Sequence, residues 1–95
     1  MIFPMVNITR GKKFTAHFKK RIHPHKELVR LYQEQIKLFI EDRNDPALND
    51  HALSGKLQGS RAFNITEDIR VIYLERGEKS FIFLNVGTHK QVYGK

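Results

Sequence analysis

Three short runs of β-branched and aromatic residues follow one another closely in the last third of the chain, at residues 61–66, 69–75 and 81–86. Such runs favour strands, because branched and aromatic side chains pack well on a pleated surface. The segments that separate them, residues 67–68 and 76–78, have the length of hairpin turns. The sequence therefore predicts an antiparallel meander of three strands.

The first half of the chain has helical periodicity. A short strand over residues 2–8 comes first, and Pro4 suits an edge position in the sheet. Two amphipathic helices follow, the first capped by Thr9 and the second over residues 24–43. Their apolar positions recur at helical spacing, at Phe14, Phe18 and Ile22 in the first helix and at Leu28, Leu31, Tyr32, Ile36, Phe39 and Ile40 in the second.

The remaining segments are predicted to be irregular. Residues 49–60 are polar and contain Gly55 and Gly59, which indicates a loop. Gly87 ends the third strand of the meander, and residues 88–95 form a short tail. We expect one α+β domain over residues 1–95, in which a helical hairpin lies on one face of a small antiparallel sheet made of the N-terminal strand and the meander.

The charge of the chain points to a polyanionic partner. The net charge is +7, and the first 26 residues hold seven Lys and Arg and no acid. Neutralising phosphates with such a surface releases condensed counterions, which favours nucleic acid, although solubility alone is an alternative. The absence of cysteine excludes disulfides and thiolate zinc sites.

Features of targeting segments are missing from the sequence. No apolar run approaches the ~20 residues that a membrane span needs. The first six residues lack the charged start and long apolar stretch of a signal peptide. We therefore expect a cytosolic protein that does not associate with membranes.

Residues suited to RNA cleavage collect in the C-terminal half. Cleavage at a 2′-hydroxyl without a metal needs a base, an acid for the leaving 5′-oxygen, and cations for the phosphate. Histidine and arginine suit these roles. The candidates are His51, Lys56, Arg61, Asp68, Arg70, His89 and Tyr93. Whether the loop and the tail bring His51 and His89 together stays open.

The other three histidines do not predict a metal site. His23 and His25 flank Pro24, and no cysteine lies near them or His17 to complete a coordination shell. We expect no metal ion and no cofactor.

Three ordered blocks, residues 52–61, 68–73 and 86–93, resemble the RelE superfamily of bacterial toxins. Within that superfamily, residues 50–53 (Asp-His-Ala-Leu) and residues 87–89 (Gly-Thr-His) are most similar to the YafQ branch. The resemblance implies the RelE-like fold and a toxin of a type II toxin–antitoxin pair. Such toxins enter the ribosomal A site and cut the mRNA there.

The resemblance also implies partners and site residues. The partners would be an acidic cognate antitoxin, mRNA and the 16S rRNA of the ribosome, with the toxin monomeric alone and part of a larger assembly with the antitoxin. His51, Asp68 and His89 would form the acid–base group, Arg70 would hold the scissile phosphate, and Tyr93 would orient or stack on the substrate. Further RNA contacts would come from Lys56, Arg61, Asn64, Lys90, Lys19 and Lys20.

Two positions depart from the branch. Asn64 stands where the branch has a histidine, and it can hydrogen-bond RNA but cannot exchange a proton. Ile69 stands where the branch has a tryptophan. Two alternatives therefore stay open: a gyrase-poisoning toxin of the ParE type, or a non-catalytic RNA- or ribosome-binding module.

Simpler explanations exist for individual residues as well. Asp68 could only form the hairpin turn, and Tyr93 could only pack the tail onto the sheet. Arg61 could brace the tail. Tyr73, in an apolar run, is expected in the core.

Overall fold

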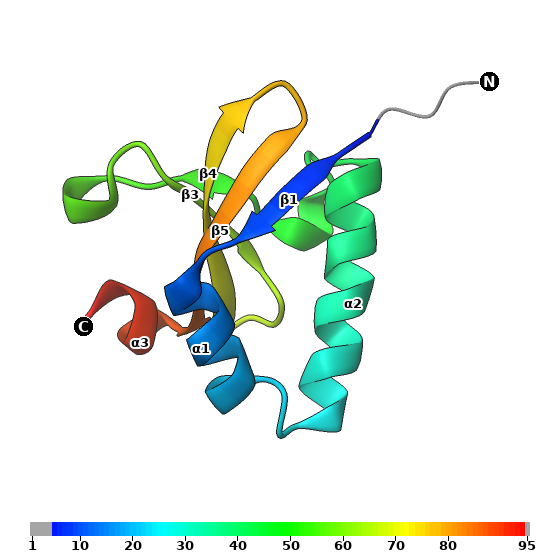
Figure 1. The fold of residues 1–95 in the computed structure, drawn as a ribbon, viewed down its shortest axis with the longest axis vertical. Coiled ribbons are helices and arrows are strands. Elements are labelled where there is room, and N and C mark those ends of the chain that lie inside the picture. Colours follow the sequence, from blue (N-terminus) through cyan, green and yellow to red (C-terminus); the bar gives the residue numbers. More distant parts are fainter. Residues whose placement is uncertain (1–4, 95) are drawn as a thin grey trace.

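The structure, a computed structural model, describes residues 5–94 as a sheet with two helices on one face and a third helix at one end (Figure 1). The elements in chain order are β1 (Asn7–Arg10), α1 (Lys12–Arg21), α2 (Lys26–Glu41), the 3-10 helix η1 (Pro46–Leu48), β2 (His51–Ala52), the 3-10 helix η2 (Gly55–Leu57), β3 (Arg61–Asn64), β4 (Ile69–Gly77), β5 (Ser80–Thr88) and α3 (His89–Tyr93).

The sheet has five strands in the order β1-β5-β4-β3-β2. The predicted meander is present, because β3 pairs with β4 and β4 with β5, both antiparallel. The prediction of an entirely antiparallel sheet is wrong, since β1 runs parallel to β5, from Asn7 opposite Ser80 to Arg10 opposite Phe83. Side-chain alternation indicates which face a strand buries, but it does not determine the direction of its neighbour.

The N-terminal strand lies at the predicted edge, but its bounds differ. The prediction covered residues 2–8, of which residues 2–4 lie outside the described part of the chain, and β1 begins at Asn7. Thr9 is not the helix cap, because it belongs to β1. Gly11 takes that place: its backbone N–H donates to the carbonyl of Phe83 (2.9 Å), which continues the ladder with β5, and its own carbonyl accepts from Thr15 N.

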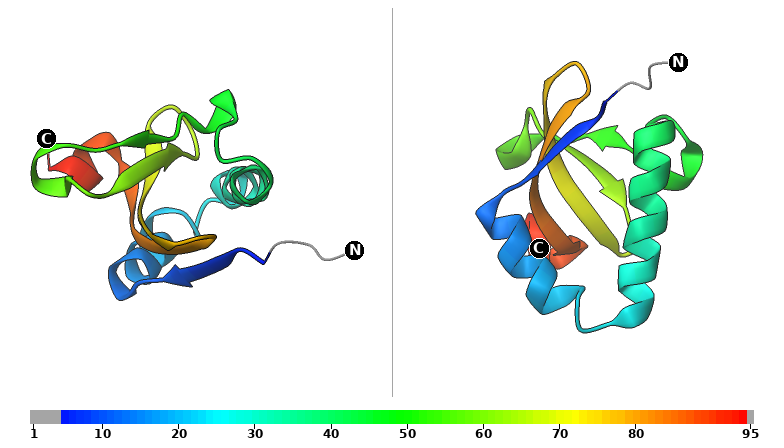
Figure 2. Two further views of the ribbon diagram at one scale, coloured as in Figure 1. Left: turned by 90° about the horizontal axis from the view of Figure 1, so that it is seen from above. Right: turned by 45° about the vertical axis from the view of Figure 1, so that its right-hand side comes forward.

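Both α1 and α2 pack on one face of the sheet, as the helical periodicity predicts (Figure 2). Phe39 of α2 contacts aromatic rings of all three central strands, including Phe63 at 4.9 Å and Tyr73 at 5.1 Å between ring centroids. Phe14 of α1 packs against Phe83 at 5.4 Å. Ile40 was expected on the apolar stripe, but it is 46% exposed, because it lies beyond the edge of the buried face.

Two segments predicted to be irregular contain regular structure. Residues 49–60 include η2 and the short strand β2, which pairs with β3. The predicted tail folds into α3. A reciprocal capping box starts this helix: Thr88 Oγ1 accepts from Gln91 N (3.2 Å), and Gln91 Oε1 accepts from Thr88 N (2.8 Å).

None of the helices described in residues 5–94 is both long and apolar enough to span a membrane.

Candidate active site

The register of the strands places three candidate residues on the face opposite α1 and α2. His51 is paired with Ala62, and Asn64 with Arg70. Phe63, between Ala62 and Asn64, belongs to the core under the helices. Because successive side chains of a strand alternate between faces, His51, Asn64 and Arg70 lie together on the side away from the core.

An open cleft of about 700 Å³ lies on this side, between α3 and the segment that carries η2. Both segments lie on the side of the sheet away from α2 in the left view of Figure 2. The cleft brings together five candidate residues: His51, Lys56, Arg70, His89 and Tyr93. The loop and the C-terminal segment therefore do bring His51 and His89 to one place.

Tyr93 is the centre of a small cluster at one wall of the cleft. The rings of His89 and Tyr93, one helical turn apart on α3, meet edge to face at 4.4 Å between centroids. The Arg70 guanidinium lies over the same Tyr93 ring, 5.8 Å from its centroid. A further hydrogen bond from Arg70 Nη2 to the Glu67 carbonyl, at 3.4 Å, is long.

Polar atoms of this cluster lack hydrogen-bond partners. Arg70 Nε, Asn64 Oδ1 and the Tyr93 hydroxyl are buried, and none has a partner within residues 5–94. Buried polar atoms in folded proteins nearly always have a partner, which can be protein or water. Two of these atoms belong to Arg70 and Tyr93, which line the cleft, and the third belongs to Asn64, the cross-strand partner of Arg70. A polar ligand bound on this face could supply the missing hydrogen bonds.

The tautomer of His51 follows from its neighbour. Its Nδ1 lies 2.8 Å from the carbonyl oxygen of Asn49. A carbonyl only accepts hydrogen bonds, so Nδ1 carries the hydrogen, and Nε2 of the neutral ring is left with the lone pair. His51 is thus arranged as a proton acceptor through Nε2.

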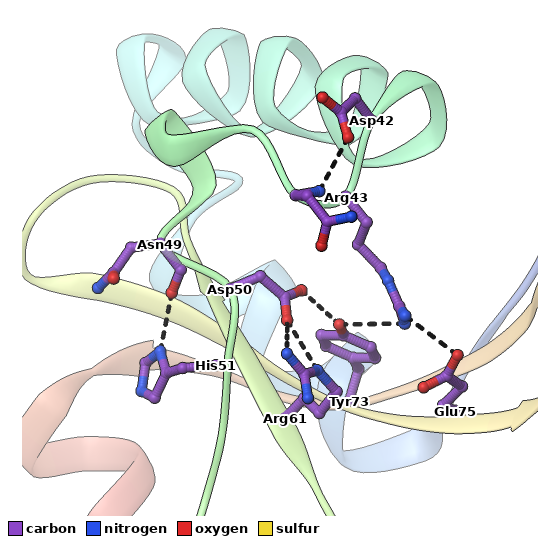
Figure 3. A network of polar contacts seen from close by, with 9 residues as sticks. Asp42, Arg43, Asn49, Asp50, His51, Arg61, Tyr73 and Glu75 are labelled. Atoms are coloured by element: carbon purple, nitrogen blue, oxygen red, sulfur yellow. Dashed lines mark hydrogen bonds and ion pairs between the residues drawn. The ribbon is translucent and has the colours of Figure 1, made fainter.

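Arg61 lies outside the cleft, on the helix-facing side of the sheet. Its Nε and Nη2 lie 2.8 and 2.6 Å from Asp50 Oδ1 (Figure 3). Arg61 therefore braces the residue before His51 and not the C-terminal tail. Tyr73 is buried in the core, as predicted.

Four other candidates do not line the cleft. Asp68 is in the β3–β4 turn, where its backbone N–H donates to Thr66 Oγ1, and its carbonyl accepts from the His89 N–H at 3.1 Å. Its backbone is thus attached to His89, although its side chain does not line the cleft. Lys90 is exposed on α3, and Lys19 and Lys20 are exposed on the last turn of α1.

The region from residue 5 to residue 94 holds no group of three or more His, Cys, Asp or Glu side chains placed to bind a metal ion.

Comparison with known proteins defines the family. The family described as "Bacterial toxin of type II toxin-antitoxin system, YafQ" matches residues 6–94. The chain belongs to this YafQ toxin family. The resemblance seen in the three sequence blocks is therefore confirmed.

Solved structures of bacterial toxins share the fold. YafQ from E. coli superimposes with a TM-score of 0.78 at 22% identity, over 95% of this chain and 100% of that one. The YafQ of the E. coli DinJ–YafQ complex gives a TM-score of 0.76 at 23% identity, over 95% and 100% of the two chains. A copper-bound mutant toxin from Helicobacter pylori gives 0.74 at 27% identity, over 93% and 99%. A comparison with curated protein sequences gives no match.

One feature of the site, the bonding of the Asp50 carboxylate, was not predicted from the sequence. Asp50 belongs to a block that matches the YafQ branch, but nothing in the local pattern indicates that its carboxylate is bound by Arg61 and Tyr73, 11 and 23 residues away.

Proposed function

We propose that this YafQ-family toxin is an endoribonuclease that cuts mRNA on the ribosome, with its own side chains as acid and base. The observation that carries the proposal is the gathering of His51, Arg70 and His89 around one cleft whose buried polar atoms lack partners. A pure binding surface needs no pair of proton-transfer groups, whereas 2′-hydroxyl cleavage needs both.

The reaction assigns one histidine to each proton. His51 Nε2 takes the proton of the 2′-hydroxyl, and the 2′-oxygen attacks the adjacent phosphorus. The bond from phosphorus to the 5′-oxygen breaks, and protonated His89 gives that oxygen its proton. The products are a 2′,3′-cyclic phosphate and a 5′-hydroxyl end, and the two histidines exchange protonation states.

Arg70 stabilises the charge that develops on the phosphate, because its guanidinium is permanently charged and can donate two parallel hydrogen bonds. Asn64 Oδ1 and the Tyr93 hydroxyl complete the substrate contacts, and the Tyr93 ring offers a surface for a base to stack on. Lys56 lines the cleft and contacts the RNA chain, and Lys90, next to His89 on α3, adds a further RNA contact. Asp68 supports His89 through its carbonyl, which accepts from the His89 N–H.

The partners follow from charge and from the family. The basic residues of α1, including Lys19 and Lys20, bind the phosphates of 16S rRNA near the A site. An acidic antitoxin neutralises the toxin by covering its basic surface; a related YafQ is known in a complex with DinJ. The protein acts in the cytoplasm, where ribosomes are.

The test is primer extension on a defined mRNA in a translating bacterial extract. The wild type is compared with His89→Ala and Arg70→Ala, and with two control variants that change the same residue types outside the cleft, His25→Ala and Arg76→Ala. Both control residues are exposed. Discrete cuts are expected from the wild type and both controls, and a loss of about 10²–10⁴-fold from His89→Ala.

Each other result rejects part of the proposal. Cuts of equal strength from His89→Ala would reject the site assignment. Translation arrest without cuts from all variants would identify a non-catalytic ribosome-binding module. With no effect on translation, a gyrase cleavage assay would test the ParE-type activity.

A further inference from the structure

The residue that precedes the proposed base in the sequence has a buried carboxylate. The Asp50 side chain is only 4% exposed. Burying a charge is costly unless it is paired and hydrogen-bonded. Since Asp50 precedes His51 and points to the opposite side of the sheet, the proposed reaction does not use it.

The carboxylate is fully engaged by two strands. Arg61 of β3 binds Oδ1 through both Nε and Nη2, and the Tyr73 hydroxyl of β4 donates to Oδ2 (Figure 3). Hydrogen bonds to charged groups are the stronger kind. Burial and the Asp50 carboxylate both raise the pKa of Tyr73, so the phenol stays protonated and remains a donor.

Tyr73 is itself held firmly. Its ring is completely buried and packs edge to face on Phe39 at 5.1 Å and on Phe81 at 5.8 Å between centroids. Asp50 is therefore attached to the aromatic core between α2 and the sheet.

The segment that carries His51 is anchored on its N-terminal side by the completely buried Leu48 and on its C-terminal side by a short strand. The strand β2 has only two residues, His51 and Ala52, and lies at the edge of the sheet. On its N-terminal side, Asn49 adopts a left-handed conformation (φ 48°), which aims its carbonyl at His51 Nδ1. This conformation is uncommon outside glycine, although Asn tolerates it better than most residues.

We propose that Asp50 is a positioning residue: its bonds to Arg61 and Tyr73 fix the 49–51 segment and so hold His51 in the form with hydrogen on Nδ1. The proposal rests on the proposed function, in which His51 accepts a proton through Nε2. A base whose tautomer and direction are fixed before substrate binds is more effective, because reacting groups must meet in a narrow range of geometries.

Two substitutions test this role. Asp50→Asn keeps the shape of the side chain but removes its charge, and Tyr73→Phe removes only the hydroxyl that reaches Asp50. Glu75→Gln is the matched control, because Glu75 pairs with Arg43 (3.1 Å) in the same polar network but does not contact Asp50. Arg43 in turn reaches the Tyr73 hydroxyl at 3.5 Å.

The main readout is the ¹⁵N NMR spectrum of the His51 ring, assigned by the signals lost in His51→Gln. This spectrum distinguishes the two tautomers in the free protein and does not depend on cleavage. Cleavage is measured alongside it, with kcat and KM determined separately on ribosome–mRNA complexes.

Wild type and Glu75→Gln are expected to show His51 with hydrogen on Nδ1. Asp50→Asn and Tyr73→Phe are expected to show a mixture of tautomers and a kcat at least about tenfold lower at unchanged KM, since a displacement of about 1 Å can cost ~10²-fold. Should Asp50→Asn fail to fold, Tyr73→Phe carries the test, because it leaves the Asp50–Arg61 pair in place.

The same His51 tautomer in wild type, Asp50→Asn and Tyr73→Phe would overturn the proposal. A wild type that cuts no RNA would reject the proposed function instead, and the NMR comparison would still decide whether Asp50 positions His51.

Discussion

Asn64 on β3 and Arg70 on β4 are cross-strand partners, and each has a buried polar atom that no group in residues 5–94 satisfies. Both side chains are placed by strands that belong to the rigid core of the fold. We propose that Asn64 Oδ1 and Arg70 Nε, the two atoms without partners, are held in place to receive a polar ligand. A substitution at Arg70 can therefore test whether the site needs a guanidinium group or only a positive charge.

We predict that Arg70→Lys lowers cleavage by about tenfold or more. Lysine keeps the charge but cannot reproduce the planar, two-pronged contact of a guanidinium, and losing a hydrogen bond to a charged group costs about 1.5–3 kcal/mol. Single-turnover cleavage of a defined mRNA measures the effect, with Arg76→Lys on the exposed end of β4 as control. Equal rates for both variants would mean that only charge matters at residue 70.

Thr88→Ala is expected to loosen α3. The Thr88 hydroxyl caps this helix, and losing such a cap costs about 0.5–2 kcal/mol. Since His89 and Tyr93 lie on α3, cleavage should fall together with the protection of the α3 amides from hydrogen exchange. Thr15→Ala, on the exposed side of α1, is the control. Unchanged exchange in α3 would show that the capping box is not needed to hold it.

Gly87→Ala should destabilise the protein by about 1–3 kcal/mol, as overpacking does. A Cβ at this position would lie 2.7 Å from both Arg21 Nη1 and Gln91 Oε1. Arg21 would have to leave the Val86 carbonyl, to which it donates at 2.9 Å. Urea unfolding measures the loss. Adding Arg21→Ala should recover part of it, and strictly additive effects would contradict the proposed clash.

The raised pKa of Tyr73 predicts a loss of stability in alkali. Burial, and then the Asp50 carboxylate, raise this pKa above its ordinary value of 10.0. The resulting stabilisation is complete below pH 10, where the phenol is protonated in both states, and it is lost as pH rises toward the folded-state pKa. The free energy of unfolding of wild type should therefore fall above pH 10.

Tyr73→Phe has no phenol at this position and isolates the effect. The free energy of unfolding of Tyr73→Phe should be lower than that of wild type at neutral pH. The difference between the two free energies should become smaller above pH 10. Tyr32, whose pKa burial also raises, is present in both proteins, so its contribution cancels. If this difference in free energy stays constant from neutral pH to above pH 10, Tyr73 has the same pKa in the folded and unfolded states, and the prediction is wrong.

Local patterns in the sequence predict the parts of the fold that depend on local physics. The apolar run in β4 predicts that Tyr73 lies in the core, and the helical spacing around Phe14 and Phe39 identifies the buried faces of the helices. The parallel direction of β1 could not be predicted, because the pairing depends on a strand far away in the chain.

The site was predictable to a similar degree. The motif blocks contain three of the candidates that line the cleft, His51, Arg70 and His89. The Thr88-to-Gln91 spacing, typical of a capping box, could have indicated α3. The contact of Asp50 with Tyr73 was not predictable, since it forms only when β4 and the segment before β2 come together.

The pairing of β1 with β5 has a consequence for how the chain folds. The contacts among β3, β4 and β5 close short loops, whereas β1 must find a partner near the other end of the chain, at a larger cost in loop entropy. We expect the meander to form early and β1 to dock late. Until β1 docks, β5 is an open strand edge, and such edges are where folding intermediates of different chains associate.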